Sequence, residues 1–350
     1  MERLSFWIGK KVQVTGHTGF MGAWLTQWLT KLDAEVSGYS LKKYDNDTLY
    51  KTLKLKKKIK DYRGNIGDYN SFKKVMDKVR PEIIFHLAAQ PLVRKSYDNP
   101  LETIQSNVVG TANVLEAIRN TKSVKAAVIV TSDKCYKNLE TGKGYMETDP
   151  MGGHDPYSAS KGCAELLVDS YRNSFFRGQK KLVSTARAGN VIGGGDFAKD
   201  RLMTDCIKAL EKGERIRVRN PKSTRPWQHV LEPVEGYLTL AEKMIKHKRY
   251  DEAWNFGPGV NSVYTVSEVV DKVIKNWGSG KWADTSKKGD KHEAKLLNLD
   301  ITKAKTQLGW HPKLKIEEAI ALTIEGYKSL KKGEIKETID KQIEEYEAML

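Results

Sequence analysis

The sequence is poor in cysteine, and its few cysteines match no disulfide framework. There are three, Cys135, Cys163 and Cys206, which is an odd number for pairing. Domains that depend on disulfides for stability carry cysteine at a much higher density. The spacing of the three also fits no metal-binding pattern. We therefore expect reduced thiols in the core or near a site, and no bound metal.

Long apolar runs are missing as well. No segment is apolar over the roughly 20 residues that a membrane-spanning helix needs. The first residues, MERLSFWIGKKVQV, pass quickly into a strand pattern, without the apolar stretch and small-residue cleavage site of a secretory signal. These absences predict a cytoplasmic protein with no membrane partner.

Acidic residues are too few to balance the basic ones. The 350 residues carry a formal net charge of +16, an excess that is one mark of nucleic-acid-binding proteins. However, the lysines are spread along the chain, and the one dense run, residues 54–60, lacks the interleaved aromatic residues that stack on bases. We therefore expect solvated lysine-rich faces that attract small anions, and no nucleic-acid partner.

Glycine is placed where a nucleotide would need it. A strand pattern with Val12 and Val14 runs into Gly16, Gly19 and Gly22, and a helical pattern and a second strand follow. Glycines at such a turn let the backbone approach a pyrophosphate, which then lies at the positive N-terminal end of the helix. A tight strand-to-helix turn without a ligand is the alternative, but the flanking strand–helix–strand order favours a dinucleotide.

The second strand lacks the acid that usually binds the adenosine ribose about twenty residues after the glycine turn. It ends instead in Gly38-Tyr39-Ser40-Leu41-Lys42-Lys43. Ser40 suits a ribose hydroxyl, whereas Lys42 or Lys43 suits a 2′-phosphate. This segment alone leaves both NAD and NADP open.

The rest of the chain continues to alternate strands with helices, which predicts a Rossmann-type, doubly wound parallel sheet of the α/β class. One apolar strand, AAVIV, is followed directly by Thr131-Ser132-Asp133-Lys134-Cys135-Tyr136. Ligands of such sheets bind outside the carboxyl ends of the strands. Further on, Tyr157 and Lys161 are four residues apart, so that a helix places them on one face.

These motifs together resemble the extended short-chain dehydrogenase/reductases, the NAD-dependent epimerase/dehydratase family. The resemblance is carried over nearly the whole length by TGHTGFMG, HLAAQ, NVVGT, Ser132 with Tyr157 and Lys161, and LDITKAKTQLGWHP. It implies a dinucleotide-binding domain of residues 1–187, to which the chain returns near 228–257. Residues 188–227 and 258–350 are then expected to form a smaller mixed α/β domain that binds a nucleotide sugar.

Within the family, TSDKCYKN, ETDPMGGHDPYSASKGCAEL, RAGNVIGGGD and RPWQHVLEP resemble segments of members that dehydrate CDP-glucose. The resemblance implies conversion of CDP-glucose to CDP-4-dehydro-6-deoxyglucose and water, for the biosynthesis of deoxysugars and surface polysaccharides. Tightly bound NAD is favoured because the hydride is returned within one cycle, with NADP as the alternative.

The resemblance also assigns the catalytic roles. Tyr157 takes the proton of the C4 hydroxyl as hydride leaves, and Ser132 steers the same oxygen. Lys161 and the positive nicotinamide together lower the pKa of the tyrosine from its usual value of about 10. Lys134 is the base at C5 and Asp133 the acid at the C6 hydroxyl. Many related dehydratases have glutamate in place of Lys134.

Binding residues follow from the same motifs. The cofactor is expected to contact Gly16, Thr18, Gly19, Phe20, Met21, Gly22, Ser40, Asn65, Ile66, Leu87, Ala88, Ala89, Asn107, Thr131, Tyr157 and Lys161. The nucleotide sugar is expected to contact Gln90, Arg94, Ser132, Asn190, Arg201 and Arg225. Relatives associate through the helices around Asn107 and Tyr157, which implies a homodimer or homotetramer. The alternatives are an epimerase of the same fold, another nucleotide-sugar dehydratase, or a dinucleotide-binding regulator without activity.

Overall fold

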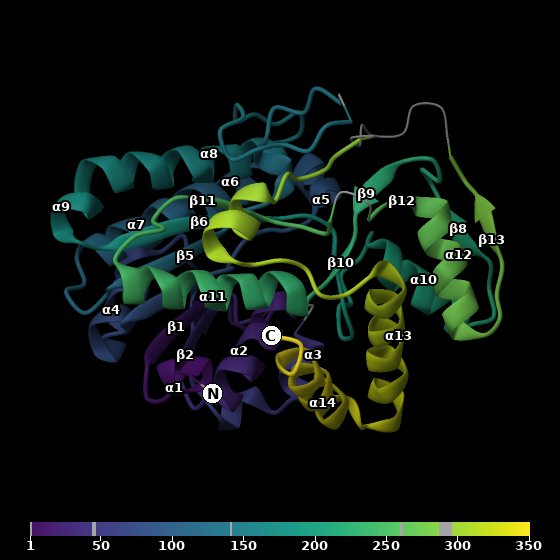
Figure 1. Ribbon diagram of the computed structural model, residues 1–350, viewed down its shortest axis with the longest axis horizontal. Helices are drawn as coiled ribbons and strands as arrows, with labels where there is room; N and C mark the ends of the chain where they lie inside the picture. The colour runs from purple at the N-terminus through teal and green to yellow at the C-terminus, as the bar shows by residue number, and fades with distance from the viewer. Residues whose placement is uncertain (1, 44–46, 141, 260–261, 287–295) are drawn as a thin grey trace.

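The protein is described from a computed structural model, which covers residues 2–43, 47–140, 142–259, 262–286 and 296–350. Its main feature is a seven-stranded parallel sheet in the order β11-β6-β5-β4-β1-β2-β3 (Figure 1). The strands are β1 (Lys11–Thr15), β2 (Glu35–Ser40), β3 (Lys60–Arg63), β4 (Ile83–His86), β5 (Ala126–Val130), β6 (Leu182–Ala188) and β11 (Ala253–Phe256). The predicted doubly wound sheet is confirmed.

Helices cover both faces of this sheet because successive side chains of a strand point to opposite faces. In β4, Ile83 packs in the same core cluster as the helices α2 (Phe20–Lys31) and α11 (Leu231–His247). Ile84 packs in a second cluster with α4 (Tyr69–Val79), α7 (Gly110–Arg119) and α8 (Pro156–Tyr171). Both faces are therefore buried, which explains the almost continuous apolar runs in the central strands.

A smaller body lies beside the carboxyl ends of the strands, on the right in Figure 1. It has its own apolar core cluster, to which α10 (Leu202–Glu211), β8 (Ile216–Val218), α12 (Val266–Trp277) and α13 (Ile316–Lys332) contribute. Three short strand pairs accompany it: β7 (Val191–Ile192) with β10 (Gln228–His229), β9 (Thr224–Pro226) with β12 (Val263–Thr265), and β8 with β13 (Trp282–Asp284).

The remaining elements connect these parts or lie at their edges. They are α1 (Glu2–Trp7), α3 (Thr48–Thr52), α5 (Val93–Asp98), α6 (Pro100–Ile104), α9 (Arg177–Gln179) and α14 (Ile335–Glu347). Short 3₁₀ turns occur at Leu55–Lys57 and Asp133–Cys135, and π-helical turns at Gln105–Val109, Arg172–Phe176 and Ala304–Leu308.

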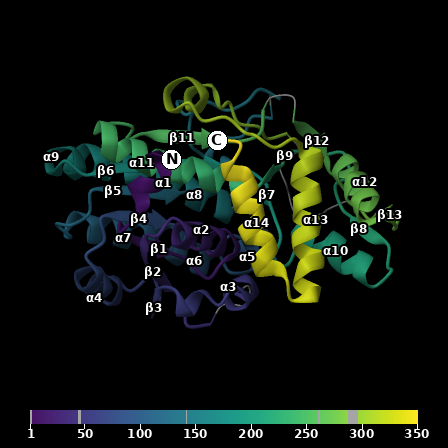
Figure 2. The ribbon, with the colours of Figure 1, turned by 60° about the horizontal axis from the view of Figure 1, so that its bottom comes forward.

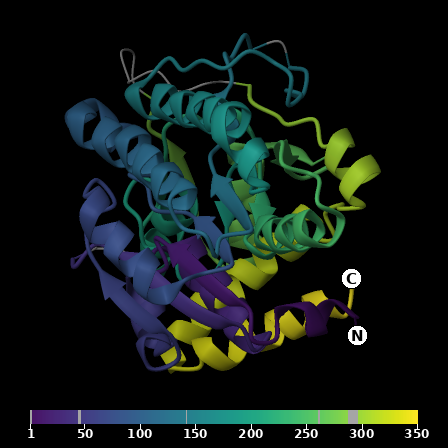
Figure 3. The same ribbon diagram turned by 90° about the vertical axis from the view of Figure 1, so that its left-hand side faces the viewer.

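The last two helices join the two bodies. They run side by side in Figure 2, and in Figure 3 their yellow ribbons lie beneath the purple N-terminal segment. Helix α13 packs in the smaller core, whereas Ile339 and Tyr346 of α14 pack in the core that contains α2. The predicted domain bounds stay a prediction. Helix α14 was assigned to the smaller domain, yet its apolar residues pack in the core of the large sheet.

Candidate active site

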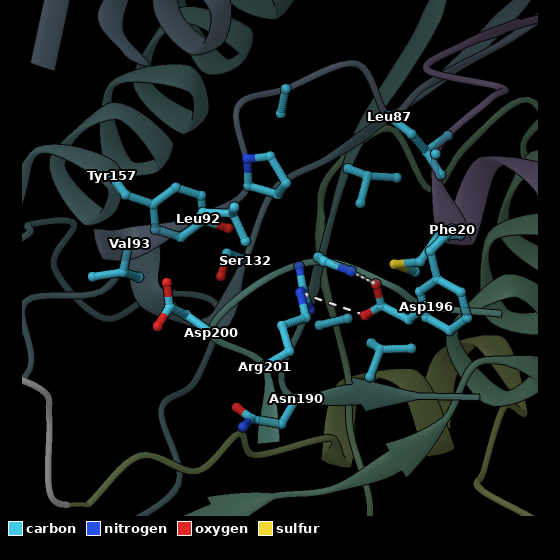
Figure 4. A pocket seen from close by; sticks show the side chains of 18 of the residues that line it. Phe20, Leu87, Leu92, Val93, Ser132, Tyr157, Asn190, Asp196, Asp200 and Arg201 are labelled. Carbon is cyan, nitrogen blue, oxygen red and sulfur yellow. Dashed lines mark hydrogen bonds and ion pairs between the residues drawn. The ribbon is translucent and has the colours of Figure 1, made fainter. Parts of the chain in front are cut away.

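A cavity of about 430 Å³ lies between the carboxyl ends of the strands and the smaller body (Figure 4). Its lining joins the glycine turn, the ends of β2, β4 and β5, the first turns of α8, and the segments 188–205 and 217–227. Almost all of the site residues predicted from the sequence line it. They are Gly16, Thr18, Gly19, Phe20, Met21, Gly22, Ser40, Asn65, Ile66, Leu87, Ala88, Ala89, Arg94, Thr131, Ser132, Asp133, Lys134, Tyr157, Lys161, Asn190, Arg201 and Arg225.

The glycine turn is packed so closely that side chains would not fit. Gly16 has a φ of +75°, and a Cβ atom there would lie 2.7 Å from the backbone nitrogen of Ala88. A Cβ atom on Gly22 would lie 2.1 Å from the Gly16 carbonyl oxygen. Gly19 precedes α2 without a side-chain cap, so the first N–H groups of the helix are left for a ligand. The turn therefore fits the pyrophosphate of a dinucleotide.

Behind Ser40, and outside the cavity lining, lies an acid that the sequence did not point to. The buried His17 ring contacts the Ser40 hydroxyl through Nδ1 (3.0 Å) and the Asp61 carboxylate of β3 through Nε2 (2.9 Å). Arg63 pairs with the same carboxylate at 2.8 Å. Burial raises the pKa of Asp61, but the hydrogen bonds from His17 and Arg63 outweigh it and hold the pKa at about 2. Because Asp61 comes from β3, no spacing rule from the glycine turn points to it.

Tyr157 lies in the first turn of α8, and its place follows from local sequence. Asp155 caps the helix by accepting from the backbone N–H of Ser158 (2.9 Å), and Pro156 occupies the first helical position. One turn later the ammonium group of Lys161 donates to the carbonyl oxygen of Val130 (3.2 Å). The helix thus starts at the cavity and is tied to the end of β5.

Burial dominates the ionisation of this pair. It raises the pKa of Tyr157 to about 12, although a hydrogen bond with Ser132 acts in the opposite direction. It also lowers the pKa of Lys161 to about 8. The expectation that the Lys161 charge favours the phenolate stays a prediction; in the protein alone burial is the larger influence, because desolvation disfavours both charged forms.

The segment after β5 turns its polar groups towards the cavity. Ser132 caps the 3₁₀ turn Asp133–Cys135 by accepting from the backbone N–H of Lys134, and it donates to Asp133 Oδ1 at 3.0 Å. Asp133 is 2 % exposed, and burial raises the pKa of its carboxyl group. A Cβ atom on Gly189 would lie 2.7 Å from Asp133 Oδ2, so that glycine leaves room for the carboxyl group.

The other half of the cavity is rich in arginine. Arg201 points towards Asp196 in Figure 4, and its Nε lies 3.5 Å from the Asp196 carboxylate. Arg219 pairs with Asp200 at 2.9 Å, and Arg225 is almost fully buried. Arg217 and Arg219 also line the cavity, although neither was predicted from the sequence. Their signal is the alternation RIRVRN at 215–220, which places alternate arginines on one side of a strand.

Two predicted residues, Gln90 and Asn107, are not part of the cavity lining as described. The Asn107 amide accepts from the backbone N–H of Gln90 (2.7 Å) and donates to its carbonyl oxygen (3.1 Å). It also donates to the Ser160 hydroxyl of α8 at 2.9 Å. Asn107 therefore braces the loop after β4 against α8 and supports the site from behind. Its place in a π-helical turn was not apparent from the sequence.

Two features are absent from the described residues. None of the helices in that part of the chain combines the length and the apolar character needed to cross a bilayer. Among the same residues, no group of three or more histidine, cysteine or acidic side chains is arranged to hold a metal ion.

The parallel sheet, the glycine turn at its centre and the Tyr157–Lys161 helix beside Ser132 define an extended short-chain dehydrogenase/reductase. The chain belongs to the family described as GDP-mannose 4,6 dehydratase, which it matches over residues 13–323. It is 44% identical over 336 residues to a CDP-glucose 4,6-dehydratase of Salmonella typhimurium, covering 94% of both chains.

Solved structures share the fold. A dTDP-glucose 4,6-dehydratase from Bacillus anthracis in complex with NAD superposes with a TM-score of 0.78 at 20% identity, covering 93% of this chain and 98% of that one. A UDP-glucose 4-epimerase of Thermotoga maritima with UDP-glucose gives 0.76 at 22% identity, covering 90% and 97%. At these identities the likeness shows the architecture alone.

Proposed function

We propose that the protein converts CDP-glucose to CDP-4-dehydro-6-deoxyglucose and water with bound NAD. The observation that carries the proposal is the Ser132-Asp133-Lys134 segment, which faces the same cavity as Tyr157 and Lys161. An epimerase or a simple dehydrogenase needs only the tyrosine, the lysine and the hydroxyl. The substrate class is supported by the relative that is 44% identical over 94% of the chain.

The first step is oxidation at C4. The Tyr157 phenolate takes the proton of the C4 hydroxyl and becomes the phenol, the Ser132 hydroxyl holds the same oxygen, and the Lys161 charge favours the phenolate beforehand. NAD, when bound in the glycine turn, would accept the C4 hydride and later return it to C6, and its positive ring would favour the phenolate. The closely packed Gly16 and Gly22 fit such a dinucleotide.

The second step is loss of water across C5 and C6. The C4 ketone makes the C5 proton acidic, the Lys134 amine removes it, and the C6 hydroxyl leaves as water with a proton from Asp133. The raised pKa of Asp133 supports the acid role, because it keeps the carboxyl group protonated at a higher pH than usual. Its Oδ2 atom has no hydrogen-bond partner among the described residues, so it is free to face a substrate hydroxyl.

The product would form when bound NAD gives the hydride to C6 and a proton returns to C5. No redox change remains, so the protein needs no second substrate. Arginines suit the diphosphate of the nucleotide through paired hydrogen bonds. We assign Arg201 and Arg225, together with Asn190, to the diphosphate and nucleotide, and Arg94 to the sugar or to the base.

The test is to incubate the purified protein with CDP-glucose, without added cofactor, and to follow the sugar nucleotide by mass spectrometry. Loss of one water supports the proposal, and dTDP-glucose is the matched substrate control. A sugar of unchanged mass but altered configuration would favour an epimerase. No conversion, even with added NAD or NADP, would contradict the proposal.

The identity of the cofactor is tested separately. Denaturing the protein and identifying the released nucleotide is expected to yield NAD, because no described residue near the end of β2 offers an arginine fork aimed at a 2′-phosphate: Arg63 is engaged by Asp61. Release of NADP would instead assign Lys42 or Lys43 to the phosphate.

We also propose a homodimer through the helices around Asn107 and Tyr157. Several apolar side chains on these helices are exposed: Leu101, Ile104, Val109, Leu166 and Phe175. Exposed apolar residues that gather on adjacent helices are typical of a contact surface. A homotetramer and a cytoplasmic location stay predictions.

A further inference from the structure

The segment Thr131–Tyr136, which carries the proposed elimination groups, is held at both ends by one buried ion pair. At its start, the Thr131 hydroxyl donates to Glu165 Oε1 at 2.5 Å. At its end, the Tyr136 hydroxyl accepts from Arg187 Nη1 at 2.6 Å, and the guanidinium lies over the Tyr136 ring at 4.8 Å. Glu165 and Arg187 join at 2.7 Å. The pair therefore closes a loop of contacts around Ser132, Asp133 and Lys134.

Both members of the pair are charged. Burial raises the pKa of Glu165, but the Arg187 charge and three hydrogen bonds outweigh it, so that the pKa lies below its usual value. The pKa of Arg187 is raised by Glu165. Both side chains are at most 5% exposed. Because desolvation offsets much of the attraction in such a pair, a net gain in stability is weak grounds for its presence.

The pair also reaches the helix of the oxidation step. Glu165 is on α8, one turn after Lys161 and two turns after Tyr157, and therefore on the same side of the helix. Arg187 is on β6, where the Thr185 hydroxyl also donates to Glu165 at 2.7 Å. The Tyr136 hydroxyl donates onward to Asn255 of β11 at 2.7 Å. The Glu165–Arg187 pair and its contacts with Thr131 and Tyr136, here called the anchor, thus connect α8, the ends of β5 and β6, and the catalytic segment.

We propose that Glu165 and Arg187 are positioning residues that fix the elimination groups relative to the oxidation groups. This rests on the proposed function, in which one sugar must meet Tyr157 at C4 and then Lys134 and Asp133 at C5 and C6. A displacement of about 1 Å can cost roughly a hundredfold in rate. Neither residue is among those that line the cavity; they act through Thr131 and Tyr136, which end the segment.

The main test removes the contact at Tyr136 without removing a charge. Tyr136→Phe deletes the hydroxyl that Arg187 holds. Tyr145→Phe is the matched control, because its ring stacks on Tyr136 with centroids 5.2 Å apart. Its hydroxyl, however, bonds to Asn138 and Leu139. Both changes delete one phenolic hydroxyl from the same pair of rings, and only one loosens the anchor.

The two steps are measured apart in a single turnover with CDP-glucose. Nicotinamide absorbance reports oxidation, and mass spectrometry of the quenched sugar reports loss of water. For Tyr136→Phe we expect oxidation to change little and water loss to slow by roughly 10- to 100-fold, in line with a displacement of up to about 1 Å. Tyr145→Phe is expected to keep the parent ratio of the two rates.

A second pair of variants tests the other end of the segment. Thr131→Val and Thr185→Val each delete one hydroxyl that donates to Glu165, but only Thr131 is part of the segment. Amide hydrogen exchange gives a readout that is independent of activity. We expect faster exchange in residues 131–136 for Tyr136→Phe and Thr131→Val, and parent-like exchange there for Thr185→Val and Tyr145→Phe.

Equal effects on both steps, or equal exchange in the variants and their controls, would overturn the positioning role and leave the pair a part of the core. A parent protein that oxidises no CDP-glucose and releases no water would instead contradict the proposed function. The two failures are thus told apart by the parent alone.

Discussion

At the scale of the residue, burial shifts both Tyr157 and Lys161 towards their neutral forms. Burial raises the pKa of Tyr157 to about 12 and lowers that of Lys161 to about 8. In the protein alone, the amine therefore loses its proton before the phenol does. The base role of Tyr157 consequently depends on a positive charge that a ligand brings into the cavity.

Replacing Tyr157 with phenylalanine tests that role. Tyr157→Phe should keep the fold and the bound cofactor, because the ring stays and only the hydroxyl is lost. We expect turnover to fall by a factor of roughly 10² to 10⁴, as for other acid–base groups. Steady-state assays with CDP-glucose measure the loss, and the ultraviolet spectrum checks the cofactor. Near-normal turnover would remove Tyr157 from the mechanism.

Replacing Lys134 separates a dehydratase from its relatives. Lys134→Met keeps the length of the side chain but has no amine, so it should block removal of the C5 proton while C4 oxidation proceeds. The protein should then hold a 4-keto sugar and absorb as reduced nicotinamide. Asp133→Asn should slow water loss because an amide donates no proton to the leaving hydroxyl, yet keep part of the C5 exchange.

Deuterium at C5 of sugar recovered from heavy water reports that exchange. Product release by Lys134→Met at close to the parent rate would show that the lysine is not the base.

The residue-level roles could be proposed from sequence because they depend on local motifs. The pKa values could not, because burial depends on residues far along the chain. Asp133, for example, is enclosed in part by Gly189, which faces its Oδ2 atom. The same limit hid the contacts of Asn107 with Gln90 and Ser160, whereas its predicted contact with the cofactor stays a prediction.

At the scale of the element, the strands and the first helix were predictable, because apolar runs and glycine turns are local signals. The π-helical turn Gln105–Val109 was not, since it interrupts a helical pattern without a distinct residue type. Nor was the contact between α14 and α2, where Trp28 Nε1 donates to Glu347 at 2.6 Å. A helical periodicity defines an apolar face but not the partner of that face.

The hydrogen bond that ties α14 to α11 predicts that the stability of the protein depends on pH. Buried Glu232 of α11 accepts from the Tyr346 hydroxyl at 2.6 Å and from the backbone N–H groups of Lys313 and Leu314. Burial raises its pKa from 4.5 to about 7. Between these values the folded protein binds more protons at this site than the unfolded chain, so this site lowers stability as the pH rises.

Glu232→Gln keeps an acceptor for these donors and removes the titration. The melting temperature of the parent, compared with that of this variant, should fall as the pH rises from about 5 to about 7, which is the range between the unfolded and the folded pKa of Glu232. Glu242→Gln, on the same helix, is the control and should keep the parent slope. A Glu232→Gln protein whose melting temperature follows the parent at every pH would show that Glu232 does not titrate in this range.

At the scale of the whole molecule, the exposed apolar residues of α6 and α8 predict self-association. Leu166 is 61% exposed, and a charge there should break a dimer by placing a carboxylate in its interface. Ile8 has the same 61% exposure on another part of the surface, so Ile8→Glu is the matched control. Light scattering should give a dimer mass for the parent and Ile8→Glu, and a monomer mass for Leu166→Glu. One mass for all three would contradict the proposed interface.

The packing of α14 on α2 also has a consequence for the nascent chain during synthesis on the ribosome. Gln27 of α2 bonds to Asp340 of α14 across 313 positions in sequence, so the surface of α2 is synthesised long before its cover. At about 5–20 residues per second, ribosomes leave this interval open for tens of seconds. During that time the apolar side of α2 that α14 will cover, with Trp28, is open to chaperones and to other nascent chains.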